Sequence, residues 1–71
     1  SYVMYPNPVN SGEIVSINAN TAVKSINVTN ILGEQLIFST SINTSGLANG
    51  TYIIDIQFAN GNFAKNKLII E

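Results

Sequence analysis

With 71 residues and a mass of 7.6 kDa, the chain has room for one domain only, because two independent cores need roughly 100 residues or more. Only 10% of its residues are charged and its net charge is −1, so it lacks the basic surface that binding to nucleic acids or anionic membranes requires. Cys and His are absent, which excludes disulfides and cysteine zinc sites and removes the commonest general base and metal ligand. We therefore expect residues 1–71 to form a single non-catalytic domain without a cofactor or a bound metal.

The uncharged residues indicate an all-β protein. Eleven Ile and five Val favour strands, while eleven Asn and five Gly favour the turns between strands. No apolar run approaches 18 residues, so we expect no insertion into a membrane. The start, SYVMYPNP, has no initiator Met and no apolar signal segment, so we expect the chain to be a piece of a longer protein.

Short runs of alternating apolar and polar residues recur along the chain. Residues 1–4 either begin the domain or end an upstream linker. The predicted strands that follow are residues 13–19, 24–31, 34–40, 51–58 and 63–70, with Asn- and Gly-rich turn signals between them. Strands of this kind predict an Ig-like antiparallel β-sandwich of about seven short strands, each with one buried face and one face in water.

The length of the last turn decides the register of the last two predicted strands. A two-residue turn at Asn60 and Gly61 would pair Ile56 with Lys65 and so place lysines on the apolar face. A turn of residues 59–61 pairs Ile56 with Ala64, and on the wet face it pairs Asp55 with Lys65. We predict the three-residue turn with Gly61 at positive φ, because a slip of one residue would turn the apolar face outward.

The residues that could carry chemistry are few and scattered. The four carboxylates are Glu13, Glu34, Asp55 and Glu71; they show neither the close pair of a glycosidase nor the clustering of a calcium loop. The glycines form neither a dinucleotide-binding nor a P-loop motif. We interpret the carboxylates as solvated surface groups and predict no catalytic residue.

Two aromatic residues are predicted to belong to the core. Tyr52 and Phe58 fall on the apolar stripe of their strand, and the Tyr52 hydroxyl should reach a backbone partner at the rim of the core. Phe63 is expected to be exposed at the hairpin tip. Carbohydrate binding or adhesion through exposed rings stays open as an alternative function, and so does the role of an Ig-like spacer between other domains.

Four stretches, in order along nearly the whole chain, resemble the type A C-terminal sorting domain of proteins exported by the type IX (Por) secretion system of Bacteroidetes. YPNPVNSGEI (residues 5–14) is similar to its opening Pro-Asn-Pro motif, and ILGEQL (31–36) to its central turn. GLANGTYIIDI (46–56) is similar to its L-x-x-G-x-Y segment, and KLII (67–70) to its terminal Lys followed by apolar residues.

The resemblance implies a function as an export signal. In that family an upstream signal peptide takes a larger cargo through the inner membrane, and the outer-membrane translocon then recognises the folded sorting domain in the periplasm. A sortase-like protease commonly removes the domain at the cell surface. The implied partners are therefore the translocon, the protease and an upstream cargo domain, and the cargo is expected at the cell surface or in the medium.

The motif residues also have a structural interpretation that needs no relatives. Pro6 and Pro8 hold the preceding Tyr5 and Asn7 in extended conformations and remove two backbone donors, which protects a sheet edge. The structural motif residues are Pro6, Asn7, Pro8, Gly33, Leu47, Gly50 and Tyr52. Among them, Gly50 is expected at positive φ after Asn49, and Leu47 is expected to close one end of the sandwich.

The last predicted strand is the candidate recognition element. Lys65 and Lys67 project from one wet face, and an edge strand with free backbone groups can be extended by a partner strand. Together with the resemblance, this makes Lys65, Lys67, Leu68, Ile69 and Ile70 the recognition candidates. The alternative is that the lysines only keep an edge strand soluble.

Overall fold

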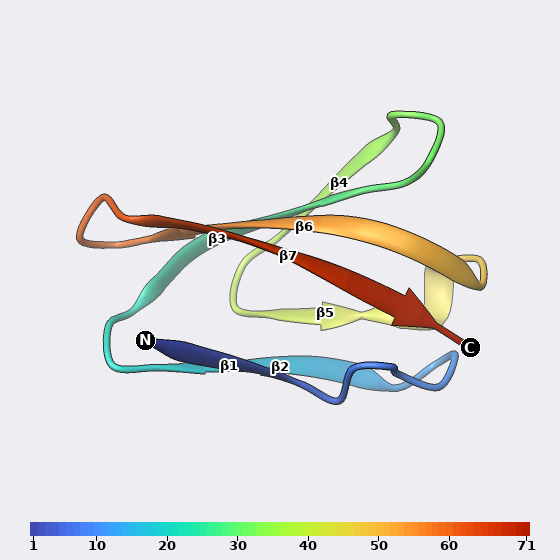
Figure 1. Ribbon diagram of the computed structural model, residues 1–71, viewed down its shortest axis with the longest axis horizontal. Coiled ribbons are helices and arrows are strands. Elements are labelled where there is room, and N and C mark those ends of the chain that lie inside the picture. The colour runs from blue at the N-terminus through green and yellow to red at the C-terminus, as the bar shows by residue number, and fades with distance from the viewer.

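Seven strands and one short 3-10 turn make up the computed structural model, which describes every residue from Ser1 to Glu71 (Figure 1). In chain order these are β1 (Tyr2–Tyr5), β2 (Ile14–Ala19), β3 (Val23–Thr29), β4 (Gln35–Phe38), β5 (Ser41–Asn43), the 3-10 turn η1 (Thr44–Gly46), β6 (Gly50–Phe58) and β7 (Phe63–Ile70).

The strands form two antiparallel sheets, one with the order β1-β2-β5 and one with the order β4-β3-β6-β7. In Ig-fold lettering the sheets are A-B-E and C′-C-F-G, which is an Ig-like sandwich without strand D. The turn η1 connects β5 to β6 where strand D would otherwise lie. The predicted fold class and the predicted number of strands are therefore confirmed.

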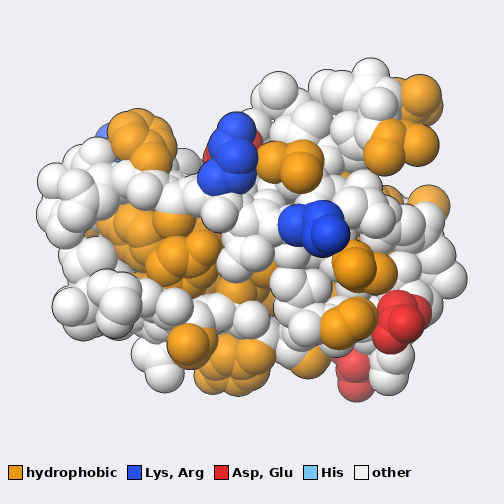
Figure 2. All heavy atoms as spheres, viewed as in Figure 1, with side chains coloured by type: hydrophobic (Ala, Val, Ile, Leu, Met, Phe, Trp, Pro, Cys, Tyr) orange, Lys and Arg blue, Asp and Glu red, His pale blue; other side chains and the backbone are white.

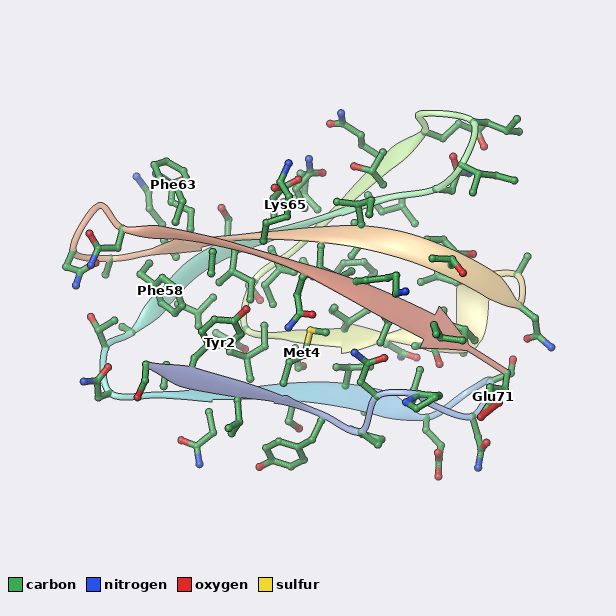
Figure 3. The ribbon with its side chains drawn as sticks, viewed as in Figure 1. Tyr2, Met4, Phe58, Phe63, Lys65 and Glu71 are labelled. Atoms are coloured by element: carbon green, nitrogen blue, oxygen red, sulfur yellow. The ribbon has the colours of Figure 1, made fainter.

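The core lies between the two sheets and follows the alternation seen in the sequence. It contains eleven buried apolar residues: Val9, Val15, Ile26, Val28, Ile42, Tyr52, Ile54, Ile56, Phe58, Leu68 and Ile70. At the end of the sandwich nearest Ser1, the rings of Tyr2 and Phe58 pack with centroids 5.9 Å apart, and both point inward in Figure 3. As predicted, Tyr52 and Phe58 belong to this core.

The two elements at the start and in the middle of the chain differ from their predicted bounds. Residues 2–5, for which no strand was predicted, form strand β1, which pairs with β2. The predicted strand 34–40 is shorter, Gln35–Phe38. In it, Leu36 pairs with Val28 on the inner face but remains 51% exposed, because β4 extends beyond the three-stranded sheet (Figure 1).

The β6–β7 hairpin has the register predicted from its turn. Ile56 pairs with Ala64 and Asp55 with Lys65, whose Nζ lies 3.6 Å from Asp55 Oδ1. The Phe58 amide donates to Asn62 O at 2.8 Å, which closes a loop of three residues with Gly61 at a φ of 91°. Phe63, the first residue of β7, is exposed as expected and points away from the sheet in Figure 3.

Candidate recognition site

The four stretches that carry the family resemblance meet at one end of the sandwich. Residues 6–13, 30–34 and 44–49 are the loops at the end opposite Ser1, and the chain also finishes there with residues 70–71 (Figure 1). We call these four segments the distal end. Because antiparallel strands carry alternate loops to the same end of a sheet, segments far apart in sequence become neighbours.

Residues 6–11 form a strap that crosses from the first sheet to the outer edge of β7. The Asn7 side chain spans two residues of that edge: its Nδ2 donates to Lys67 O at 2.7 Å, and its Oδ1 accepts from the Ile69 amide at 3.2 Å. The strap continues with Val9, whose amide donates to Ile69 O and whose carbonyl accepts from the Glu71 amide, both at 2.9 Å. Asn7 thus replaces the backbone pairing that the flanking prolines cannot provide.

This strap corrects one premise of the sequence analysis. We expected β7 to be an edge strand with free backbone groups, but from Lys67 to Glu71 its outward groups are bonded to the strap. The Lys67 amide itself donates to the side chain of Asn66 at 2.8 Å. A partner strand could add at this part of β7 only by displacing the strap. The sequence pattern did not predict this contact, because Asn7 lies 60 or more residues from its partners Lys67 and Ile69 along the chain.

The five recognition candidates on β7 divide between its two faces. Leu68 and Ile70 are buried in the core, so a partner of the folded domain cannot contact them. Lys65, Lys67 and Ile69 alternate with them on the outer face of the sheet. Lys65 forms the only ion pair of the structure, with Asp55, whereas Lys67 is exposed and lies across from Ile53.

The β3–β4 loop presents two apolar side chains to solvent. Ile31 is 88% exposed and Leu32 is 79% exposed. The Asn30 side chain organises the loop: its Oδ1 accepts from the amides of Leu32 and Glu34, each at 2.9 Å, and its Nδ2 donates to Glu34 Oε1 at 2.7 Å. Gly33 takes a φ of 85°, which suits a residue without a Cβ.

The β5–β6 connection holds the remaining motif residues. Thr44 is fully buried; its Oγ1 donates to Glu13 O at 2.6 Å and accepts from the Gly12 amide at 2.9 Å. Leu47 packs against the core, as predicted for a residue that closes this end of the sandwich. The Tyr52 hydroxyl donates to Ala48 O at 2.5 Å, which is the expected backbone partner and the arrangement of a tyrosine corner. Gly50 has the predicted positive φ, 149°.

Replacing Asn7 with Ala should loosen the end of β7 without unfolding the domain. The change removes both side-chain bonds to the edge, and exposed bonds of this kind contribute about 1 kcal/mol together. We expect the Ile69 amide to exchange with solvent deuterium about fivefold faster, measured by NMR. Asn10→Ala is the matched control, because the Asn10 side chain lies in the same strap and bonds nothing. Equal exchange rates at Ile69 in the two variants would contradict the bridging role of Asn7.

A shallow polar hollow of about 330 Å³ lies on the outer face of the four-stranded sheet. Ser25, Asn27, Asp55 and Gln57 line it, and the exposed ring of Phe63 forms one side. Asn27 Oδ1 is buried there and accepts no hydrogen bond from the protein. Polar groups beside an aromatic ring are the chemistry that a sugar requires, so this hollow is the place where the alternative function would reside.

Charge is distributed unevenly over the molecule. Every ionisable side chain of the distal end is a carboxylate, namely Glu13, Glu34 and Glu71, whereas lysines lie over β7 (Figure 2). Nowhere in the structure do three or more His, Cys, Asp or Glu residues form a group that could hold a metal ion. It also contains no helix with the length and hydropathy that crossing a membrane demands.

Sequence reasoning did not identify several residues that build this end. The roles of Asn7 as a clamp, Thr44 as a buried polar link and Asn30 as the organiser of a loop were not predicted. A local signal existed only for Asn30, since Asn before a Gly-containing turn often bonds its own loop. The partners of Asn7 and Thr44 are distant in sequence, and no pattern within a single strand reveals them.

Comparison with known families identifies one match. Residues 3–71 match the family described as the secretion system C-terminal sorting domain, which confirms the resemblance of the chain to type IX (Por) sorting domains. The match spans β1 to the end of the chain, so it includes the strap, both distal loops and β7. No curated protein matches the chain.

Proposed function

The chain belongs to the secretion system C-terminal sorting domain family, and on that premise we propose that it is the non-catalytic address that sends a larger cargo through the type IX apparatus. The family is one of sorting signals, so export is its general function. The finer proposal is that the translocon recognises the folded sandwich in the periplasm, that a sortase-like protease then acts, and that the cargo reaches the cell surface or the medium.

One observation supports recognition of a folded shape: the four segments of the distal end come together only when the sandwich is folded. In an unfolded chain the strap and β7 are separated by about 60 residues, whereas in the structure Asn7 bonds Lys67 and Ile69 directly. A receptor that contacts the distal end therefore distinguishes the folded domain from an unfolded one.

The direct test places the chain after a reporter protein that carries a periplasmic signal peptide. We expect the fusion to leave cells that have a type IX apparatus and to remain in the periplasm of cells without its outer-membrane translocon. The reporter without the chain is the control. If the fusion stays in the periplasm of both strains, the proposed function is wrong.

Lys67 remains the recognition candidate of choice on β7, because it is exposed and has no carboxylate partner. Lys67→Ala should lower export of the fusion about fivefold, since a charged contact contributes roughly 1 to 2 kcal/mol. Lys24→Ala is the matched control. Lys24 is also exposed and has no carboxylate partner, but it lies near the start of β3, away from the distal end. Equal export of the two folded variants would favour the alternative, that Lys67 only keeps the strand soluble.

Carbohydrate binding is the second candidate, because the polar hollow beside Phe63 offers Asp55, Gln57 and the unpaired Asn27 Oδ1 to a ligand. Retention of the chain on polysaccharide columns, lost on Phe63→Thr replacement, would support it. Export without glycan retention would leave sorting as the function.

A further inference from the structure

The β3–β4 loop is the most unusual part of the surface. Ile31 and Leu32 are adjacent and are the two most exposed of all the large apolar residues in the structure. A β-turn of this kind folds equally well with polar residues, because Asn30 and Gly33 supply its local bonds and its backbone geometry. Folding of the domain therefore does not require the side chains of residues 31 and 32 to be apolar.

The loop is ordered before it meets a partner. The amides of Leu32 and Glu34 both donate to Asn30 Oδ1, and the Asn30 amide donates to Glu34 O at 2.9 Å. Because the backbone is already held, a partner that binds Ile31 and Leu32 loses little free energy to ordering the loop. A pre-ordered apolar pair is an efficient anchor for binding.

Two partly apolar hollows adjoin the loop. A hollow of about 250 Å³ separates it from the start of β6, where Ala48 and Tyr52 form the other wall. A neighbouring hollow of about 400 Å³, which shares Ala48 and Tyr52 with the first, lies between the partly exposed Leu36 and Leu47. A partner seated on the loop would thus also cover the segment from Leu47 to Tyr52, which carries a second family motif.

The charges near this surface favour one type of occupant. All the ionisable side chains of the distal end are carboxylates, and Glu34 belongs to the loop itself. Two copies of the chain meeting through their loops would bring like charges together, and an anionic bilayer would repel them. A protein surface with an apolar socket and a basic rim has complementary charge.

An acidic group of the same partner, outside its basic rim, would lie within reach of Lys67. Along the outer face of the sheet, Gln35 pairs with Thr29, Thr29 with Ile53 and Ile53 with Lys67. Three strand spacings separate the two ends of this row, about 14 Å. One interface of ordinary size covers that span.

We propose that Ile31 and Leu32 are the anchor through which the export apparatus holds this domain, inserted into an apolar socket that Lys or Arg side chains surround. This inference rests on the proposed function and adds the surface and the chemistry of the partner. It fits the position of the cargo, because a cargo attached before Ser1 lies at the opposite end of the sandwich (Figure 1).

The test uses the reporter fusion with matched double variants. Ile31→Thr with Leu32→Thr should reduce export tenfold or more, which corresponds to roughly 1.4 kcal/mol of binding. Val3→Thr with Ile37→Thr removes two exposed apolar residues elsewhere, and export should stay within about twofold of the unmodified fusion. Glu34→Gln keeps the acceptor for Asn30 but removes the charge, so it should reduce export about threefold.

The outcomes separate this inference from the function on which it rests. If the unmodified fusion is not exported, the proposed function fails and the inference fails with it. If the unmodified fusion and the folded Ile31/Leu32 variant are exported equally, only the inference fails. The inference is also overturned if the pair instead drives dimerisation, measured by sedimentation, or binding to phosphatidylcholine vesicles.

Discussion

Replacing Leu68 with Ala is expected to lower export strongly, because it removes most of the stability of the domain. Leu68 is fully buried between the sheets, and truncation of a buried Leu costs about 2 to 5 kcal/mol. A domain of this size without disulfides has a total stability on the order of 5 kcal/mol. The melting temperature, followed by circular dichroism, should fall by about 15 °C or more.

Ile69→Ala is the control for this prediction, because Ile69 is adjacent but faces outward opposite Thr51. The substitution should lower the free energy of unfolding by about 1 kcal/mol or less. The comparison also shows why single substitutions are more informative than truncation. Removal of the last residues deletes the core residues Leu68 and Ile70 together with any recognition signal. Equal melting temperatures of the two variants would show that the strand does not alternate as the structure has it.

Thr44→Val should destabilise the domain by about 2 to 3 kcal/mol although the two side chains have nearly the same shape. Valine cannot accept from the Gly12 amide or donate to Glu13 O, and a buried polar group left unpaired costs about 1 to 3 kcal/mol. The measurement is urea denaturation, with an unchanged m-value as the sign that the unfolding transition is still the same.

Thr44→Ser separates the contribution of the hydroxyl group to stability from the contribution of the methyl group. Serine retains both hydrogen bonds and loses one buried methyl, so its cost should be about 1 kcal/mol. If the Ser variant were less stable than the Val variant, packing and not hydrogen bonding would be the role of Thr44. The outcome also bears on recognition, because Thr44 ties the β5–β6 connection to Gly12 and Glu13, which follow the strap at the distal end.

Together these variants allow an export assay to distinguish loss of the folded domain from loss of a recognition surface. Variants at Leu68 or Thr44 lower the stability of the fold, whereas variants at Lys67, Ile31 or Leu32 change exposed side chains. Loss of export in the first group supports recognition of the folded domain. Loss in the second group locates the surface that is read.

The predictions that succeeded depend on short-range patterns. The alternation around Ile54 and Ile56 predicted β6 and its buried face, and the choice between two turn lengths at Gly61 predicted the pairing of Asp55 with Lys65. Such features follow from the period of two in a strand and from the geometry of a turn. The strand β5 was missed because three residues are too few to show any period.

The sequence by itself determined the sandwich, its hairpin register and the absence of His- and Cys-based chemistry, since each depends on residue types or on neighbours a few positions apart. Only the tertiary structure decided that Asn7 covers the edge of β7 and that Leu36 stays half exposed. It likewise brought four separate motifs to one end of the sandwich. These features depend on which distant segments come into contact, and that is decided when two sheets bury a common core.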